Sequence, residues 1–250
     1  MTEPTKTEEV HFYPGSKIMV YVVEDRVKAI AEAWGGPAIK QPRLTGEKMA
    51  AGPTTSGRFV IDRLEAYRTD SWKMSKIPWG TPIRGSRTDT RRLEYLSESG
   101  KWRPSTIMLE DEVPDPKRKG KLKKVRRLLN TMDVLHLNFH YRRSHEFPDT
   151  WLFNDFGPVA VRYYRDKNSN RKLDANEKLS GEMIHTTPLN EGQSDRFKGD
   201  FREVELVNSH GCIHIRPIDR QKFIDAGAFR QGMTLIVHPY EQIFDPDAYE

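Results

Sequence analysis

The feature that most constrains the fold of this chain is a series of short runs rich in β-branched and aromatic residues, separated by turn-rich stretches. Runs of this length and composition are typical of β-strands, and clusters of glycine, proline and serine between them are typical of turns. The second half of the first run is also compatible with a helix. The sequence predicts strands over residues 17–34 (a hairpin), 58–67, 134–141, 157–166 and 233–240.

Two segments carry apolar residues at helical spacing instead, and we expect helices over 120–133 and 218–229. No internal repeat and no clean linker interrupts the chain. We therefore expect a mainly β fold with a few helices, of the α+β class. The expected organisation is a polar N-terminal arm at 1–16, a single domain at 17–240 with an insertion or accessory subdomain at 85–150, and a tail at 241–250.

Charge and cysteine content narrow the class of function. The net charge of +5 at pH 7 favours an anionic partner such as nucleic acid, a membrane surface or a cell-wall polymer. A single cysteine excludes an internal disulfide and any zinc site built from several cysteines. No stretch reaches the roughly 18 apolar residues of a transmembrane segment. The N-terminus lacks the apolar core of a signal peptide.

The only cysteine lies in the stretch NSHGCIHIRP, residues 208–217. The preceding glycine permits a tight turn that points the amides of Gly211 and Cys212 at one spot, as an oxyanion site requires. A thiol with a pKa of about 8.5 needs a base to attack at neutral pH. Two other interpretations stay open: a buried, inert cysteine, and a zinc site with two histidines, although no familiar zinc spacing is present. The candidate bases are His185, His210 and His214.

Three motifs, in the same order along the chain, resemble those of the L,D-transpeptidase catalytic domain, the YkuD-type fold. SHGC at 209–212 is similar to the segment that carries the nucleophile in that family. MIHTTP at 183–188 is similar to the segment that carries the base, and AGPTTSGRFVI at 51–61 is similar to a segment that leads into a strand. The resemblance covers roughly residues 17–240 and implies a YkuD-like β-sandwich, a β-rich catalytic domain.

The resemblance implies a cysteine-dependent peptidoglycan enzyme. Cys212 would attack the diaminopimelate–D-alanine bond of a tetrapeptide stem, and His185 would take the thiol proton. D-alanine departs, and a thioester forms on the cysteine. An amine then attacks the thioester and gives an L,D-cross-link or an exchanged D-amino acid. In an L,D-carboxypeptidase, water hydrolyses the thioester instead. The further residues implied are Ser209 or Thr186 for orienting the base, Gly211 for the oxyanion, and His210 and His214 for loop support or substrate contact. For Arg216 two interpretations stay open, a bidentate contact to a substrate carboxylate and a surface ion pair.

The chain departs from the family at three points. His185 and Cys212 are 27 residues apart, farther than is usual in the family, so we expect 190–205 to be an insertion that forms a lid or a substrate wall. His214 stands where the family commonly has arginine or asparagine. The region 85–150 has no counterpart.

An enzyme of this kind implies peptidoglycan stem peptides as partners, no required cofactor and no nucleic acid. It implies action in the periplasm or cell envelope, reached after removal of a targeting segment or by another secretion route, as for an antibacterial effector. The alternative from a different class is a non-catalytic basic module that binds the cell wall or nucleic acid.

Two further segments carry signals of their own. DKNSNRKLDANE, residues 166–177, has an arginine where the sharp turn of a calcium loop normally has glycine, so a polar turn is the alternative to a structural calcium site. The run 117–127 holds eight basic residues in eleven and predicts either contact with an anionic polymer or the solvated face of an amphipathic helix. The EF-hand-type ligand positions are Asp166, Asn168, Asn170, Asp174 and Glu177.

Overall fold

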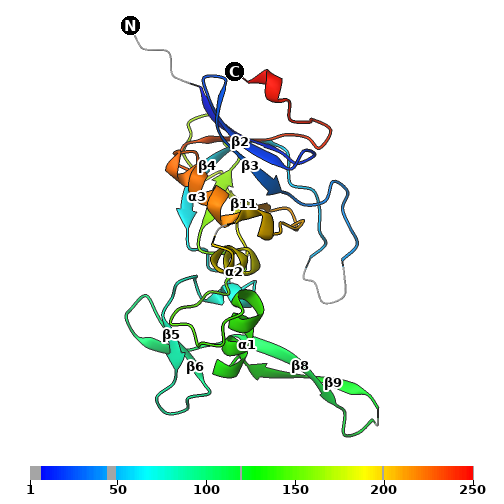
Figure 1. The fold of residues 1–250 in the computed structure, drawn as a ribbon, viewed down its shortest axis with the longest axis vertical. Coiled ribbons are helices and arrows are strands. Elements are labelled where there is room, and N and C mark those ends of the chain that lie inside the picture. Colours follow the sequence, from blue (N-terminus) through cyan, green and yellow to red (C-terminus); the bar gives the residue numbers. More distant parts are fainter. Residues whose placement is uncertain (1–6, 44–48, 119, 199, 250) are drawn as a thin grey trace. The chain divides into compact units, whose positions relative to one another are not determined.

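The computed structural model describes residues 7–43, 49–118, 120–198 and 200–249. The chain divides into two compact units, which are described separately (Figure 1). We call Met1–Glu65 with Val159–Glu250 the barrel unit, and Ala66–Pro158 the inserted unit. The expected insertion at 85–150 lies within the second of these, which begins at Ala66.

Eight strands of the barrel unit close into a barrel with the order β1-β13-β4-β10-β11-β12-β3-β2. Two of the neighbouring pairs are parallel, β1 with β13 and β11 with β12. The mainly β class is confirmed, and the strands form one closed sheet instead of two packed sheets. The bounds are β1 Glu8–Tyr13, β2 Ile18–Val23, β3 Arg26–Trp34, β4 Gly57–Glu65, β10 Ala160–Tyr164, β11 Leu179–His185, β12 Ile213–Ile215 and β13 Thr234–Val237.

The barrel interior is filled by alternate residues of its strands, because successive side chains of a strand point to opposite faces of the sheet. Burying these apolar side chains is the main favourable contribution to the stability of the unit. The strands predicted over 17–34, 58–67, 157–166 and 233–240 are confirmed. Core residues supplied by the strands include Val10, Phe12, Met19, Ala31, Ile61, Tyr163, Ile184, Ile213 and Leu235.

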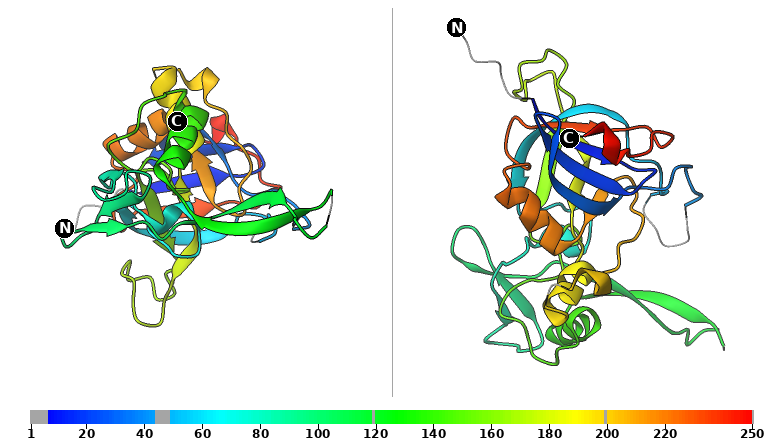
Figure 2. Two further views of the ribbon diagram at one scale, coloured as in Figure 1. Left: turned by 90° about the horizontal axis from the view of Figure 1, so that it is seen from below. Right: turned by 45° about the horizontal axis from the view of Figure 1, so that its top comes forward.

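The polar arm expected at 1–16 is wrong for residues 8–13, which form β1; residues 1–6 lie outside the described part of the chain. Polar residues alternate there with Val10 and Phe12, both fully buried. The polar composition of the segment led to the wrong prediction, although the alternation is typical of a strand. The C-terminal segment lies over the first strands (Figure 2). In this contact the hydroxyls of Tyr13 and Tyr249 hydrogen-bond at 2.5 Å.

Two helices belong to the barrel unit, α2 Pro188–Arg196 and α3 Pro217–Asp225. The helix predicted over 218–229 is confirmed as α3 and ends earlier, since Gly227 follows it with φ 75°. Both helices carry proline in the first turn, where its missing N–H costs nothing. The 3₁₀ turns of this unit are Phe201–Glu203 and Pro246–Ala248.

The inserted unit has its own apolar core and two small sheets. One helix, α1 Thr131–Arg142, and a 3₁₀ turn, Met74–Lys76, accompany them. The core residues are Ile77, Ile83, Leu93, Ile107, Leu129, Val134, Trp151 and Phe153. The strands are β5 Ile83–Gly85, β6 Leu93–Leu96 and β7 Trp102–Pro104 in one sheet, and β8 Met108–Pro114 and β9 Leu122–Leu128 in the other.

Two predictions in the inserted unit are wrong. Half of the helix predicted over 120–133 is β9, and the strand predicted over 134–141 is part of α1. The helix begins at Thr131 because Asn130 and Asp133 form a capping box, each side chain accepting the other's backbone N–H. Its buried side chains, Val134 and Asn138, recur at helical spacing.

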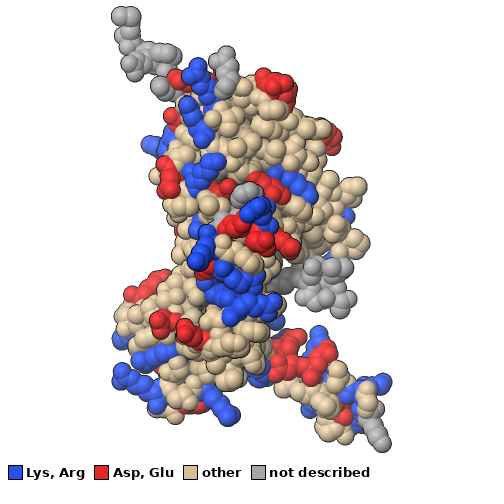
Figure 3. All heavy atoms as spheres, viewed as in Figure 1, with Lys and Arg blue, Asp and Glu red and all other residues tan. Residues whose placement is uncertain are grey.

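The basic run 117–127, apart from residue 119, which lies outside the described residues, therefore lies on the turn and second strand of the β8–β9 hairpin. Figure 3 shows acidic side chains near the base of this hairpin and basic ones near its tip. Side chains of opposite charge form ion pairs across the two strands, as Arg126 and Glu110 do at 3.1 Å. No helix in the described part of the chain is long and apolar enough to cross a membrane.

Candidate active site

Cys212 lies in a tight turn directly before β12. Gly211 adopts φ 129°, which side chains of L-residues rarely tolerate. The buried hydroxyl of Ser209 fixes the turn by accepting the Gly211 N–H at 3.0 Å and donating to the Cys212 carbonyl. Ser209 is thus a part of the turn. The Gly211 amide, expected as an oxyanion donor, is engaged by this hydroxyl, and the Cys212 amide is the donor that remains for that role.

His185 ends β11, the parallel neighbour of β12, and pairs in register with His214. Its ring Nδ1 lies 2.7 Å from the carbonyl oxygen of Thr186. Because a carbonyl only accepts hydrogen bonds, Nδ1 carries the proton and Nε2 is the nitrogen that can take one up. A backbone carbonyl, instead of the hydroxyl of Ser209 or Thr186, orients this imidazole.

The strands bring the thiol and the imidazole to one region. Ile184 pairs with Ile213, so Cys212 comes beside Met183, whose backbone N–H hydrogen-bonds to the thiol. His185 is two residues beyond Met183 on the same face of β11. The pairing of β11 with β12 therefore brings two residues that are 27 positions apart in sequence onto adjacent segments of the sheet, with His214 as the direct partner of His185.

Burial keeps both groups neutral. Burial and, to a smaller extent, the nearby His214 ring lower the pKa of His185 to about 3, against the hydrogen bond to the Thr186 carbonyl, which raises it. Burial also raises the pKa of the Cys212 thiol to about 11. The hydrogen bond from the Met183 N–H acts in the opposite direction, because it favours the thiolate. The resting pair is thus thiol and imidazole, and not thiolate and imidazolium.

A buried ion pair supports the turn after His185. The hydroxyl of Thr186 donates to Glu191 of α2, and the Glu191 carboxylate pairs with Arg220 of α3. Both charged side chains are about one-tenth exposed. The pair holds the two helices against the residue whose carbonyl orients His185. The expected insertion 190–205 contributes α2 to this arrangement.

Glu182 is a site residue that the sequence reasoning missed. Its carboxylate accepts the Thr55 hydroxyl at 2.8 Å and contributes to the raised pKa of Cys212. Burial raises the pKa of Glu182 itself. A Cβ on Gly211 would lie 3.2 Å from its Oε1, so the carboxylate borders the turn that carries Cys212. The only sequence signal is its alternation with Ile184 on β11, which does not mark a functional residue.

The remaining expected residues have structural contacts. His214 Nδ1 is bonded to the Val207 carbonyl at 2.9 Å, and its ring meets that of His185 edge-on at 4.8 Å between centroids. His210 lies near enough to contribute to the lowered pKa of His214. Arg216 donates to the Val204 carbonyl and pairs with Glu32 at 2.7 Å. The Arg216 guanidinium therefore has hydrogen-bonding partners within the protein and does not need a substrate carboxylate as a partner.

The proposed calcium ligands lie together in the loop between β10 and β11, where their side chains bond to the loop itself. Asp166 accepts three backbone N–H groups, and Asp174 accepts the side-chain amides of Asn168 and Asn170. Glu177 accepts two further backbone N–H groups. Among the described residues, no three His, Cys, Asp or Glu side chains are arranged to hold a metal ion. The calcium site stays a prediction.

Comparisons with known proteins are sparse for this sequence. No protein-family model and no curated protein matches it. Solved structures that match include L,D-transpeptidases of Xylanimonas cellulosilytica (residues 123–326), with 10% identity and a TM-score of 0.36, and of Mycobacterium smegmatis, with 11% and 0.34. L,D-transpeptidase 3 of Mycobacterium tuberculosis has 15% identity and a TM-score of 0.31.

These matches cover 95%, 93% and 93% of this chain and 63%, 59% and 61% of the three solved chains, respectively. The chain thus spans about three-fifths of the structures it matches. TM-scores this low carry no conclusion about substrate, activity or site. The three solved proteins are members, by name, of the family that the ordered sequence motifs resemble.

Proposed function

We propose that this chain is a cysteine acyltransferase of the L,D-transpeptidase type, acting on peptidoglycan stem peptides. The observation that carries the proposal is the pairing of β11 with β12, which puts His185 and the Cys212 turn on adjacent segments, with the imidazole oriented by the Thr186 carbonyl. A half-buried thiol in the same region as an oriented histidine is the arrangement expected of a nucleophile with its base. The proposed place of action is the periplasm or cell envelope, where such stems occur.

In the first half-reaction the Cys212 thiol gives its proton to His185 Nε2 as sulfur attacks the carbonyl carbon between diaminopimelate and D-alanine. The Cys212 amide faces the developing oxyanion. When the tetrahedral intermediate collapses, the C–N bond breaks and the leaving D-alanine amine takes the proton back from the imidazolium. A thioester on Cys212 and free D-alanine result.

In the second half-reaction an acceptor amine attacks the thioester and restores the thiol. An amine of a neighbouring stem gives a cross-link, a free D-amino acid gives an exchanged stem, and water gives a tripeptide. Because burial keeps the thiol and the imidazole neutral at rest, proton transfer must accompany attack. The free enzyme should therefore react slowly with simple alkylating reagents at neutral pH, since the thiolate is the nucleophile.

The test is incubation of purified enzyme with tetrapeptide muropeptides, followed by mass spectrometry of the products. We expect D-alanine release by the wild type, and its loss by a factor of about 10³ or more in Cys212→Ala and His185→Ala. Arg216→Lys is the matched control, because it keeps the charge near Glu32 and lies outside the reacting pair; we expect it to retain activity. Turnover in Cys212→Ala, or none in the folded wild type, would contradict the proposal and favour a non-catalytic binding module.

A further inference from the structure

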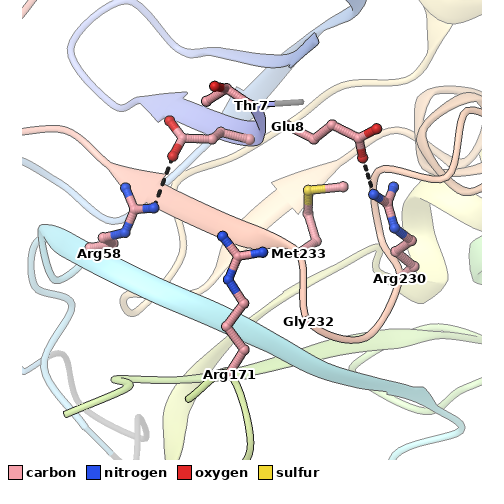
Figure 4. Close-up of a pocket in the computed structure, with 8 residues that line it drawn as sticks. Thr7, Glu8, Arg58, Arg171, Arg230, Gly232 and Met233 are labelled. Atoms are coloured by element: carbon pink, nitrogen blue, oxygen red, sulfur yellow. Dashed lines mark hydrogen bonds and ion pairs between the residues drawn. The ribbon is translucent and has the colours of Figure 1, made fainter. Parts of the chain in front are cut away.

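The barrel unit contains a pocket of about 620 Å³ whose lining residues come from four separate segments. The segments are the start of β1, the start of β4, the loop between β10 and β11, and the stretch that leads into β13. Three arginines face the pocket, and Met233 lies between Arg58 and Arg230 (Figure 4). The lining residues used below are Glu8, Glu9, Arg58, Arg171 and Arg230.

Two of the three arginines are held by carboxylates on the wall of the pocket. Arg58 pairs with Glu9 at 2.9 Å, and Arg230 pairs with Glu8. The third, Arg171, has no hydrogen bond or ion pair from its side chain to any other described residue. Figure 4 shows its guanidinium directed into the space between the two ion pairs. Three guanidiniums against two carboxylates leave one positive charge in excess.

The backbone of the loop is built to present this side chain. Arg171 adopts φ 58°, a left-handed conformation that favours glycine. The Asp166 carboxylate holds it there by accepting the N–H groups of Ser169 at 2.8 Å and Arg171 at 2.9 Å. A glycine would satisfy the same turn without steric cost, so the turn alone does not call for arginine at this position.

We propose that the pocket binds an oxyanion, the phosphate or carboxylate group of a molecule about the size of a sugar, with Arg171 as its main ligand. A guanidinium is a planar fork of N–H donors that matches two oxygens of either group. Glu8 and Glu9 keep the flanking guanidiniums in place and restrict the site to a ligand of small negative charge. This site is independent of Cys212 and of the reaction proposed for it.

The experiment is isothermal titration calorimetry of the full chain with inorganic phosphate, sn-glycerol 3-phosphate and D-lactate, each at the same ionic strength set by sodium chloride. We expect saturable binding with one site per chain. Stronger binding of glycerol phosphate than of lactate would assign the ligand to phosphates, and the reverse order would assign it to carboxylates.

Two variants make the test specific. Arg171→Gly removes the guanidinium while easing the left-handed turn, so we expect unchanged folding and binding weaker by about tenfold or more. Lys172→Gln removes one positive charge from the next, exposed position and should bind as the wild type does. Absence of saturable binding of all three probes by the wild type, or wild-type affinity in Arg171→Gly, would overturn the proposal.

Discussion

At the scale of single residues, backbone groups define the candidate site around Cys212 as much as side chains do. The carbonyl of Thr186 sets the tautomer of His185, and the Met183 N–H meets the thiol of Cys212. Backbone dipoles of this kind are fixed by the strands, so they need no reorganisation during a reaction. Motifs predict the reacting residues, but the partners that orient them follow only from strand pairing.

The first residue-scale prediction concerns Gly36, which packs against the turn that carries Cys212. A Cβ at this position would lie 1.8 Å from the Gly52 carbonyl oxygen and 3.2 Å from the Gly211 nitrogen. Gly36→Ala must push these backbones apart, so we expect a loss of about 2–3 kcal/mol in the free energy of unfolding and of about a hundredfold in D-alanine release. Urea denaturation and the muropeptide assay measure the two effects.

The matched control for this prediction is Gly181→Ala on β11. A Cβ there meets nothing within 4 Å, and the position is exposed. We expect it to change neither quantity. Equal effects of the two substitutions would refute the steric explanation.

The second residue-scale prediction is a loss of stability in mild acid. Burial lowers the pKa of His185 from 6.5 to about 3, so folding favours its neutral form. Its contribution is complete above pH 6.5. It falls as the unfolded chain takes up a proton below that value, by about 1.4 kcal/mol per pH unit, until the folded pKa is reached.

Urea denaturation at several pH values between about 5 and 7 gives this slope. His185→Gln should reduce the slope of unfolding free energy against pH by the contribution of one proton, about 1.4 kcal/mol per pH unit. His140→Gln, at an exposed position, should leave the slope unchanged. The lowered pKa values of His214, His11 and His238 should maintain part of the slope in the variant. Identical slopes in wild type and His185→Gln would contradict the assignment.

At the scale of elements, short-range patterns predicted β2, β3, β4, β10 and β13 and missed β1, β11 and β12. In the inserted unit, the errors came where two patterns competed. Leu122, Val125 and Leu128 are spaced like a helix face, yet they lie exposed on β9. The capping residues Asn130 and Asp133 mark the true start of the helix, and this signal was present in the sequence. Glu182 and the Glu191–Arg220 pair had no local signal, because their roles depend on contacts between distant segments.

The prediction at this scale concerns the loop between β10 and β11. The carboxylates of Asp166, Asp174 and Glu177 already accept hydrogen bonds within the loop, so its fold does not need a cation. We expect added calcium to leave the melting temperature unchanged. A bound ion would raise it in proportion to the logarithm of calcium concentration over Kd. A rise with calcium that Asp174→Asn abolishes would establish the site.

At the scale of the whole molecule, the chain leaves the barrel unit after β4 and returns to it just before β10, at two positions that are paired with each other. Glu65 and Ala160 are directly opposite partners in the antiparallel pair of β4 and β10. Replacing 66–159 by Asn-Gly would join them through a two-residue hairpin turn. We expect the shortened chain to keep its β-rich circular dichroism spectrum and to unfold in one cooperative transition. Insoluble or non-cooperative product would show that the barrel needs the inserted unit.

The closing pair of the barrel joins the first strand of the chain to the last. Glu9 is paired with Thr234 through the parallel contact of β1 and β13. During synthesis on the ribosome, β1 can pair with β13 only after the chain has been translated as far as Val237. The turn that carries Cys212 emerges before β13, so the barrel around it closes only after synthesis has passed Val237. A nascent chain would thus hold its thiol in an unfinished barrel, and the proposed chemistry would begin only after the last strand has docked.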